Sequence, residues 1–181
     1  MDLVEREREM ESLTALLDAL VEGQPRMALI EGPSGIGKTR LLTELRRAAG
    51  ERRIPSLGAR GSELEREFPF GVVRQMLEPA LKARSDRAEL FEGAAEVAAA
   101  VFEPPSDGPS GGDASFAVLH GLYWLIHDLV GGRPLLLTID DLHWCDRPTL
   151  RALAYVVRRL EGVPLLIVAT VHCAPFCTNA T

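Results

Sequence analysis

The chain has 181 residues with a formal net charge of −6, and its 46% hydrophobic and 25% charged content is typical of one globular domain. These values exclude collagen-like, mucin-like and wholly disordered chains, and the acidic balance disfavours a general nucleic-acid binder, because phosphate contacts need a basic surface. Three cysteines do not make a disulfide framework, no apolar run reaches the roughly 20 residues of a membrane span, and the N-terminus lacks a secretory pattern, so we expect a cytoplasmic protein.

The first half of the chain alternates helical and strand patterns. Residues 5–22 carry apolar side chains at three- and four-residue spacing, which predicts an amphipathic helix, and the Arg and Glu residues at 5–11 are expected to form its solvated face. A short apolar run at 27–30 predicts a buried strand, and helical spacing returns at 38–52. The other elements predicted here are a weak strand at 54–59 and helices at 70–84 and 86–102.

A stretch rich in Pro, Gly and Ser at about 103–113 cannot build a core, so we expect a mobile surface loop there. The elements predicted after it are a helix at 114–130, an apolar strand at 135–139, a helix at about 148–161 and a last strand at 165–169. Helices that alternate with apolar strands predict a three-layer α/β fold with a mostly parallel sheet. This domain is expected to span residues 1–170, and residues 171–181 to form an irregular tail.

Residues 32–39 match the phosphate-binding pattern G-x-x-x-x-G-K-[ST] without a mismatch, between a predicted strand and a predicted helix. Glycines let the backbone wrap closely, so that successive N–H groups point at an anion beside a helix N-terminus. We expect Lys38 to be an exposed ligand of the β- and γ-phosphates and Thr39 to ligate Mg²⁺. The alternative is a glycine-rich turn that only ends a strand. The candidate nucleotide-binding residues are Gly32, Pro33, Ser34, Gly35, Ile36, Gly37, Lys38, Thr39 and Arg40.

The strand at 135–139 ends in two aspartates, Asp140 and Asp141. In open α/β sheets, ligands bind at the carboxyl edge of the strands. We therefore expect Asp140 to hold Mg²⁺ and Asp141 to stand where an ATPase keeps its water-activating carboxylate. The alternative is a solvated aspartate pair at a strand end. Nearby, His143 is expected to pack or hydrogen-bond, and Asp146 to cap the next helix.

Six stretches of the chain carry a resemblance: 3–7, 31–39, 59–65, 68–75, 119–125 and 140–146. Together they resemble the N-terminal ATP-binding module of large LuxR-type transcriptional regulators. These regulators belong to the signal-transduction ATPases with numerous domains, the STAND group, which are relatives of the AAA+ ATPases. The likeness covers about residues 2–170. The Phe-Pro-Phe-Gly and Asp-Asp-Leu-His-Trp stretches make it more specific than the phosphate loop alone.

The resemblance implies a P-loop fold of the additional-strand type, in which ATP binding controls self-association. By similarity, Lys38 and Thr39 would bind phosphates and Mg²⁺, Asp140 would hold the metal, and Asp141 would assist slow hydrolysis. Relatives continue into a helical lid, often a repeat region, and a DNA-binding helix-turn-helix. None of these is found here, so the resemblance implies a truncated module that does not itself bind DNA. Relatives also have an arginine where this chain has Val171.

Within this fold we expect the Asp140 strand to lie beside the phosphate-loop strand, with the last strand on the other side of the phosphate-loop strand. The predicted function is an ATP- and Mg²⁺-binding regulatory switch with slow or no hydrolysis. Asp141 is one methylene shorter than the glutamate of AAA+ motors, and reaction geometry tolerates little error. Two alternatives stay open: a working AAA+-type ATPase, or a folded remnant that does not bind nucleotide.

Overall fold

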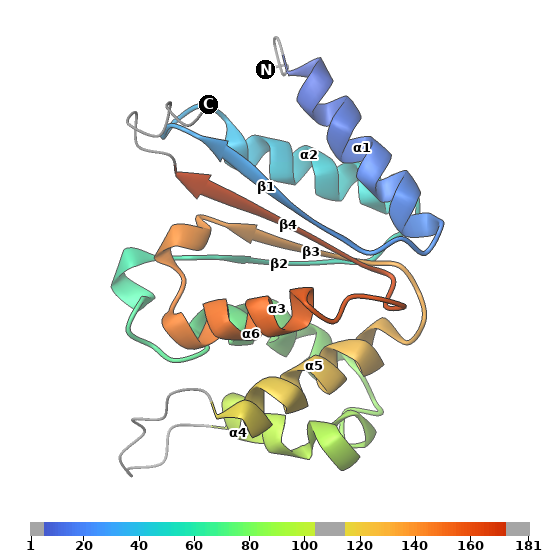
Figure 1. Ribbon diagram of the computed structural model, residues 1–181, viewed down its shortest axis with the longest axis vertical. Helices are drawn as coiled ribbons and strands as arrows, with labels where there is room; N and C mark the ends of the chain where they lie inside the picture. The colour runs from blue at the N-terminus through green and yellow to red at the C-terminus, as the bar shows by residue number, and fades with distance from the viewer. Residues whose placement is uncertain (1–5, 104–114, 173–181) are drawn as a thin grey trace.

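The computed structural model describes residues 6–103 and 115–172, and its centre is a four-stranded sheet between two layers of helices (Figure 1). Each neighbouring pair of strands is parallel. The strand order is β1-β4-β3-β2. The strands are β1 (Arg26–Gly32), β2 (Ser56–Arg60), β3 (Leu135–Asp140) and β4 (Leu165–His172). This arrangement confirms the predicted three-layer α/β fold with a parallel sheet.

The order of the strands differs from our expectation, because β4 lies between β1 and β3. Ala28 of β1 is in register with Val168 of β4, and Ile167 of β4 is in register with Leu137 of β3. The prediction that β3 lies beside β1 was therefore wrong. The physical reason is burial. Residues 165–170 of β4 are all buried, as suits an inner strand covered on both faces, whereas the Leu29 side chain of the edge strand β1 is 49% exposed.

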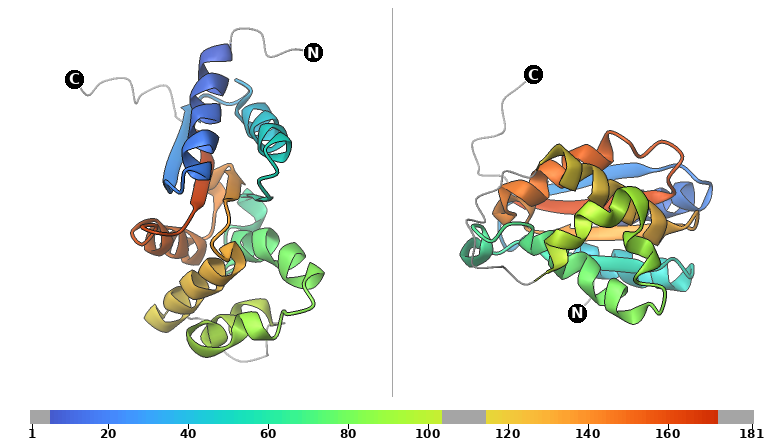
Figure 2. Two further views of the ribbon diagram at one scale, coloured as in Figure 1. Left: turned by 90° about the vertical axis from the view of Figure 1, so that its right-hand side faces the viewer. Right: turned by 90° about the horizontal axis from the view of Figure 1, so that it is seen from below.

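Helices cover both faces of the sheet. The helices α1 (Glu7–Val21) and α2 (Lys38–Glu51) pack on one face, beside β1 in Figure 1. The other face is packed by α3 (Gly71–Ala83), α5 (Phe116–Val130) and α6 (Arg147–Val157), which lie together in the two further views of Figure 2. The sheet therefore separates two apolar cores, the larger of which belongs to the second group of helices.

Alternation along the inner strands decides which core each side chain joins. Leu136 of β3 and Val168 of β4 pack with α1 and α2, whereas Leu137 packs with the opposite helices. Residues two apart on a strand share a face. Asp140 and Thr170 therefore lie on the face that α2 covers, at the carboxyl ends of their strands. This is the side from which the phosphate loop enters α2.

The segment at 86–102 is not the single helix that its alanines predict. It forms two 3₁₀ helices, η2 (Glu89–Phe91) and η3 (Gly93–Ala98), and a short α4 (Ala99–Phe102). Gly93 has a φ of +60°, which interrupts a right-handed helix. A Cβ on Gly121 of α5 would come within 3.0 Å of the Ala98 nitrogen, so the two backbones pack directly. The small side chains here permit close packing instead of a long helix.

The irregular tail predicted at the end of the chain does not begin at residue 171. β4 continues through Val171 and His172, so the expected tail at 171–181 starts inside a strand. Its remaining residues, and the loop predicted at about 103–113 apart from Glu103, lie outside the described residues. Among the helices that the structure describes, none combines the length and apolar character needed to cross a membrane.

Candidate functional site

The phosphate loop joins β1 to α2 and has the backbone that its motif predicts. Gly35 and Gly37 have φ angles of +77° and +95°, which only glycine adopts without strain. Gly37 is the N-terminal cap of α2, so the free N–H groups of that helix begin at the loop. A Cβ on Gly32 would lie 3.1 Å from the Ile36 Cγ2 atom. The loop therefore wraps closely onto itself at the N-terminus of a helix.

Lys38 is buried, which differs from the exposed ligand that we expected. Its Nζ atom donates hydrogen bonds to the carbonyl oxygens of Gly32, at 2.7 Å, and Pro33, at 2.8 Å. A buried ammonium group must satisfy its donors inside the protein, and the loop carbonyls meet this need. Lys38 thus holds the two ends of the phosphate loop together in addition to lining the space beside it.

Thr39 and Asp140 meet across the gap between the loop and the sheet. The Thr39 hydroxyl donates to Asp140 Oδ2 at 2.7 Å, although the two residues are 101 apart in the sequence. The other carboxylate oxygen, Oδ1, accepts from the Thr170 hydroxyl at 2.6 Å. The Asp140 side chain is nearly buried, so these two hydroxyl groups fix its direction. The pair that the sequence assigned to one metal ion is therefore in contact.

Thr170 is a site residue that the sequence analysis did not identify. Besides donating to Asp140, its hydroxyl accepts from the backbone N–H of Asp141 at 2.8 Å. One side chain of β4 therefore orients both aspartates of β3. A signal for it was present, because Thr170 directly follows the apolar run at 165–169 and shares a face of the strand with Leu166 and Val168.

Asp141 is held by a second residue that the sequence analysis missed, Arg60 at the end of β2. Asp141 Oδ2 accepts from Arg60 Nε at 3.1 Å and from Arg60 Nη2 at 2.9 Å. The Asp141 backbone has a φ of +54°, a strained conformation for an L-residue. Gly61 makes this close approach of β2 possible, since a Cβ there would lie 2.4 Å from the Asp141 carbonyl oxygen. Arg60 thus neutralises the carboxylate that we expected to activate water.

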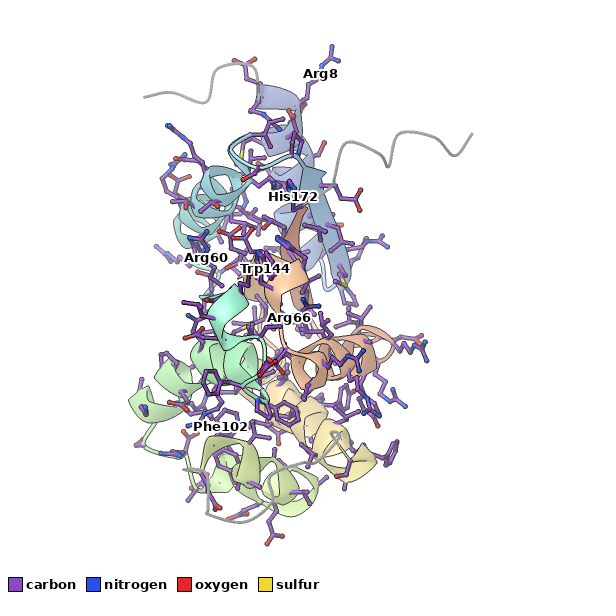
Figure 3. The ribbon with its side chains drawn as sticks, turned by 90° about the vertical axis from the view of Figure 1, so that its left-hand side faces the viewer. Arg8, Arg60, Arg66, Phe102, Trp144 and His172 are labelled. Carbon is purple, nitrogen blue, oxygen red and sulfur yellow. The ribbon has the colours of Figure 1, made fainter. Side chains whose placement is uncertain are left out.

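Lys38, Thr39, Arg60 and Asp141 line a cleft of about 900 Å³, within the size range of small-molecule sites, whereas Asp140 and Thr170 are not among its lining residues. Figure 3 shows Arg60 and Trp144 close together, with His172 on the side of α1 and α2. Gly32, Pro33 and Ile36 of the predicted set belong to the loop without lining the cleft. The lining residues are Ser34, Gly35, Gly37, Lys38, Thr39, Arg40, Thr43, Glu44, Arg60, Asp141, His143, Trp144 and His172.

The segment after Asp141 is anchored by hydrogen bonds that confirm two expectations. His143 accepts a hydrogen bond through Nδ1 from the His172 backbone N–H at 3.4 Å, as expected of a hydrogen-bonding residue. Asp146 caps α6, because its Oδ1 atom accepts from the Thr149 N–H at 2.8 Å. The same oxygen accepts from the Phe70 N–H at 2.9 Å. Asp146 thereby also ties the segment between β2 and α3 to this wall of the cleft.

Cys145 lies behind the cleft and is buried. Burial, reinforced by the charges of Asp146 and Asp141, raises the pKa of the Cys145 thiol to about 12. The thiolate is the reactive form of cysteine, and at neutral pH almost none of it forms here. Cys145 is therefore a packing residue beside the site.

Comparisons with known proteins give one family profile and one curated relative. The sequence profile of the family described as "AAA ATPase domain" matches residues 2–168. An uncharacterized protein of Rhizobium meliloti (strain 1021) is 27% identical over 194 residues, which cover 93% of this chain and 18% of that protein. The chain therefore spans less than a fifth of that relative.

Two solved structures match nearly the whole chain. The ORC1 protein of Aeropyrum pernix, solved in complex with DNA, matches 99% of this chain and 42% of its own, with 22% identity and a TM-score of 0.52. PCH-2 of C. elegans matches 99% of this chain and 40% of its own, with 14% identity and a TM-score of 0.49. At such identities the ORC1 likeness is one of fold.

Proposed function

The chain belongs to the AAA ATPase domain family, and from this premise we propose that it binds ATP with Mg²⁺ in the cleft between the phosphate loop and the carboxyl end of β3. The observation that carries the proposal is the 2.7 Å hydrogen bond between the Thr39 hydroxyl and Asp140. It brings the metal-binding end of the loop motif to the acidic strand end. A glycine-rich turn that only ended a strand would have no reason to meet a buried aspartate.

The residues present suit Mg²⁺. No group of three or more His, Cys, Asp or Glu side chains that could hold a metal by itself occurs among residues 6–103 and 115–172. Mg²⁺ instead uses one or two protein oxygens together with water and substrate phosphates. The Thr39 hydroxyl and the Asp140 carboxylate are oxygen donors of this kind. When bound, the ion would neutralise charge on the phosphate oxygens.

Hydrolysis in this site is proposed to be slow. A general base must reach the proton of the attacking water with a free acceptor oxygen. Asp141 Oδ2 already accepts hydrogen bonds from two N–H groups of Arg60. Asp141 would therefore offer water its other carboxylate oxygen, in a direction that the contact with Arg60 fixes. This supports a nucleotide-dependent switch over a fast motor.

The larger context is proposed to be a LuxR-type transcriptional regulator in which ATP controls self-association. Its support is the set of stretches that resemble that family, two of which touch each other. Phe70 of the Phe-Pro-Phe-Gly stretch donates its N–H to Asp146 of the segment that begins at Asp140. Sedimentation of the chain with Mg·ATP and with Mg·ADP tests this part. We expect a larger species with Mg·ATP, and identical sedimentation would contradict it.

Thermal unfolding with and without Mg·ATP tests the nucleotide site. A ligand that binds only the folded state at a hundredfold excess over its Kd adds about 2.7 kcal/mol, or about 5–10 °C for a chain of this size. We expect this rise for the wild type and for Lys82→Ala, which removes an exposed lysine of α3. Lys38→Ala should abolish it.

Because Lys38 also bonds the loop carbonyls, a second variant separates binding from folding. Thr39→Ala leaves the contacts of Lys38 in place and removes one oxygen donor of the proposed ion. It should unfold cooperatively and show little stabilisation by Mg·ATP. A wild type that unfolds cooperatively at the same temperature with and without Mg·ATP would contradict the proposed function.

A further inference from the structure

The start of α1 contacts the phosphate loop through Arg6. Arg6 Nη2 donates a hydrogen bond to the backbone carbonyl oxygen of Ile36 at 2.9 Å, and its Nη1 donates to Glu9 Oε1 at 3.0 Å. The Arg6 side chain is only 22% exposed. The prediction that the charges at 5–11 only form a solvated face was therefore wrong for Arg6. Arg8 of the same helix is exposed, and Figure 3 shows it pointing away from the cleft.

The position of this hydrogen bond matters because a peptide group is planar. In a trans peptide, the C=O and N–H bonds point in opposite directions. The Ile36 carbonyl is turned toward Arg6, so the N–H of Gly37 in the same peptide points the other way. Gly37 lines the cleft, whereas Ile36 does not. The contact with Arg6 therefore corresponds to a Gly37 N–H directed toward the space inside the loop.

The loop has few other means of holding this peptide. Gly35 and Gly37 on either side both have positive φ angles, and glycine populates positive and negative φ about equally, so neither residue restricts the loop to this conformation. Ile36 is 43% exposed, and its side chain lies against Gly32 of the same loop, so it does not tie the loop to another element. A hydrogen bond from a charged donor is among the stronger ones in proteins, and here it anchors the loop to a helix.

We propose that Arg6 is a positioning residue, which holds the Ile36–Gly37 peptide so that its N–H faces the phosphates of the bound nucleotide. Arg6 acts through the loop and touches no ligand itself. The inference rests on the proposed function for the identity of the ligand. The proposed role is preorganisation: an N–H group that already points at the anion does not have to be ordered when the nucleotide binds, so no binding free energy is lost to ordering it.

Affinity measurements on the full chain test the proposal with Mg·ATP, Mg·ADP and Mg·tripolyphosphate. Arg6→Ala should weaken all three to a similar extent, roughly tenfold, since each places phosphate in the loop. Arg6→Lys should recover part of the loss, because lysine can donate one hydrogen bond. Arg8→Ala should bind as the wild type does. A loss confined to the two nucleotides would place Arg6 at the base or ribose and overturn the proposal.

Hydrogen exchange without nucleotide gives an independent readout. The amides of residues 33–38 should exchange faster in Arg6→Ala than in Arg8→Ala, while the unfolding temperatures of the two variants stay close. Equal exchange together with equal affinity would overturn the positioning role and leave the proposed function intact. If the wild type does not bind Mg·ATP, the proposed function fails. Faster exchange in Arg6→Ala would then support the anchoring of the loop, and unchanged exchange would overturn it.

Discussion

The two walls of the cleft are built in different ways. The phosphate-loop wall is formed by the segment 32–40, which runs continuously from the end of β1 into the first turn of α2. The strand-end wall is assembled from the end of β2, the end of β3, the turn that follows β3 and the end of β4. Its lining residues are Arg60, Asp141, His143, Trp144 and His172. A continuous wall can be recognised from a motif, whereas an assembled wall depends on which strands become neighbours.

The comparison also concerns charge. The phosphate-loop wall is held by Lys38, whose ammonium group bonds two carbonyl oxygens of its own loop. The strand-end wall is held by Arg60 and Thr170, which bind the two aspartates. Each wall is thus ordered by internal contacts that a nucleotide and its metal ion would partly replace. The following changes test the walls separately.

The largest effect is expected where the two walls touch. Asp140→Asn keeps the shape of the side chain and removes its charge, so it should weaken Mg²⁺-dependent ATP binding by about 10–100-fold. Binding measured with and without Mg²⁺ checks this. Asp128→Asn, an exposed aspartate on α5, is the matched control and should bind like the wild type. An Asp140→Asn variant with undiminished affinity in Mg²⁺ would remove this residue from the metal site.

The next effect tests how the strand-end wall is supported. Thr170→Val removes the hydroxyl that serves Asp140 and the Asp141 N–H, which leaves buried polar groups without partners. We expect a loss of about 1–3 kcal/mol in the free energy of unfolding, measured in urea. Thr170→Ser keeps the hydroxyl and should retain most of the stability. Equal losses in the two variants would indicate that packing, not hydrogen bonding, is the role of Thr170.

A smaller effect concerns the rate of hydrolysis. Arg60→Ala frees Asp141 from an exposed ion pair. Such pairs stabilise a protein by up to about 1 kcal/mol. If that energy no longer has to be overcome before Asp141 meets water, ATP turnover should rise about two- to fivefold. The same change made in an Asp141→Asn background should have no effect, because the base is then absent. Arg87→Ala, which removes an exposed arginine far from the cleft, is the control. Slower turnover in Arg60→Ala would mean that Arg60 assists the reaction.

The effect that is smallest at neutral pH concerns Cys145, behind the strand-end wall. Its thiol has a pKa raised to about 12 by burial and by neighbouring aspartates. The folded state therefore retains the proton that the unfolded state loses at its ordinary pKa, so this group lowers stability as the pH rises from about 9 toward 12. At pH 8 the native protein should be alkylated at Cys145 only as fast as it unfolds. Mass spectrometry of the peptide with Cys145 measures this, and rapid labelling of the native protein would contradict the burial.

Much of the fold followed from local patterns. The amphipathic helices, the apolar strands and the loop motif all appear close to their expected positions, because each depends on neighbours within a few residues. Thr39 and Asp140, which the sequence assigned to the same metal ion, are in contact. Alternation along β3 accounts for this contact, because Asp140 lies on the same face of the strand as Leu136, which packs with α1 and α2.

The errors have different causes. The place of β4 between β1 and β3 and the contact of Arg6 with the loop involve partners distant in sequence. In the segment at 89–98, Gly93 with its positive φ interrupts the predicted helix, and Gly121 of α5 lets the backbone of η3 approach closely. The burial of Lys38 follows from the conformation of its own loop, in which the carbonyl oxygens of Gly32 and Pro33 accept its hydrogen bonds.

The sequence by itself determined the α/β class, the phosphate loop and the aspartates, because periodicity and glycine spacing act through local backbone geometry. The tertiary structure alone decided the strand order, and with it the meeting of Arg60, Thr170 and Asp141 at one edge of the sheet. The reason is that strand neighbours are selected by total burial. The six buried residues of β4 at 165–170 are covered on both faces and paired on both sides only in an inner position.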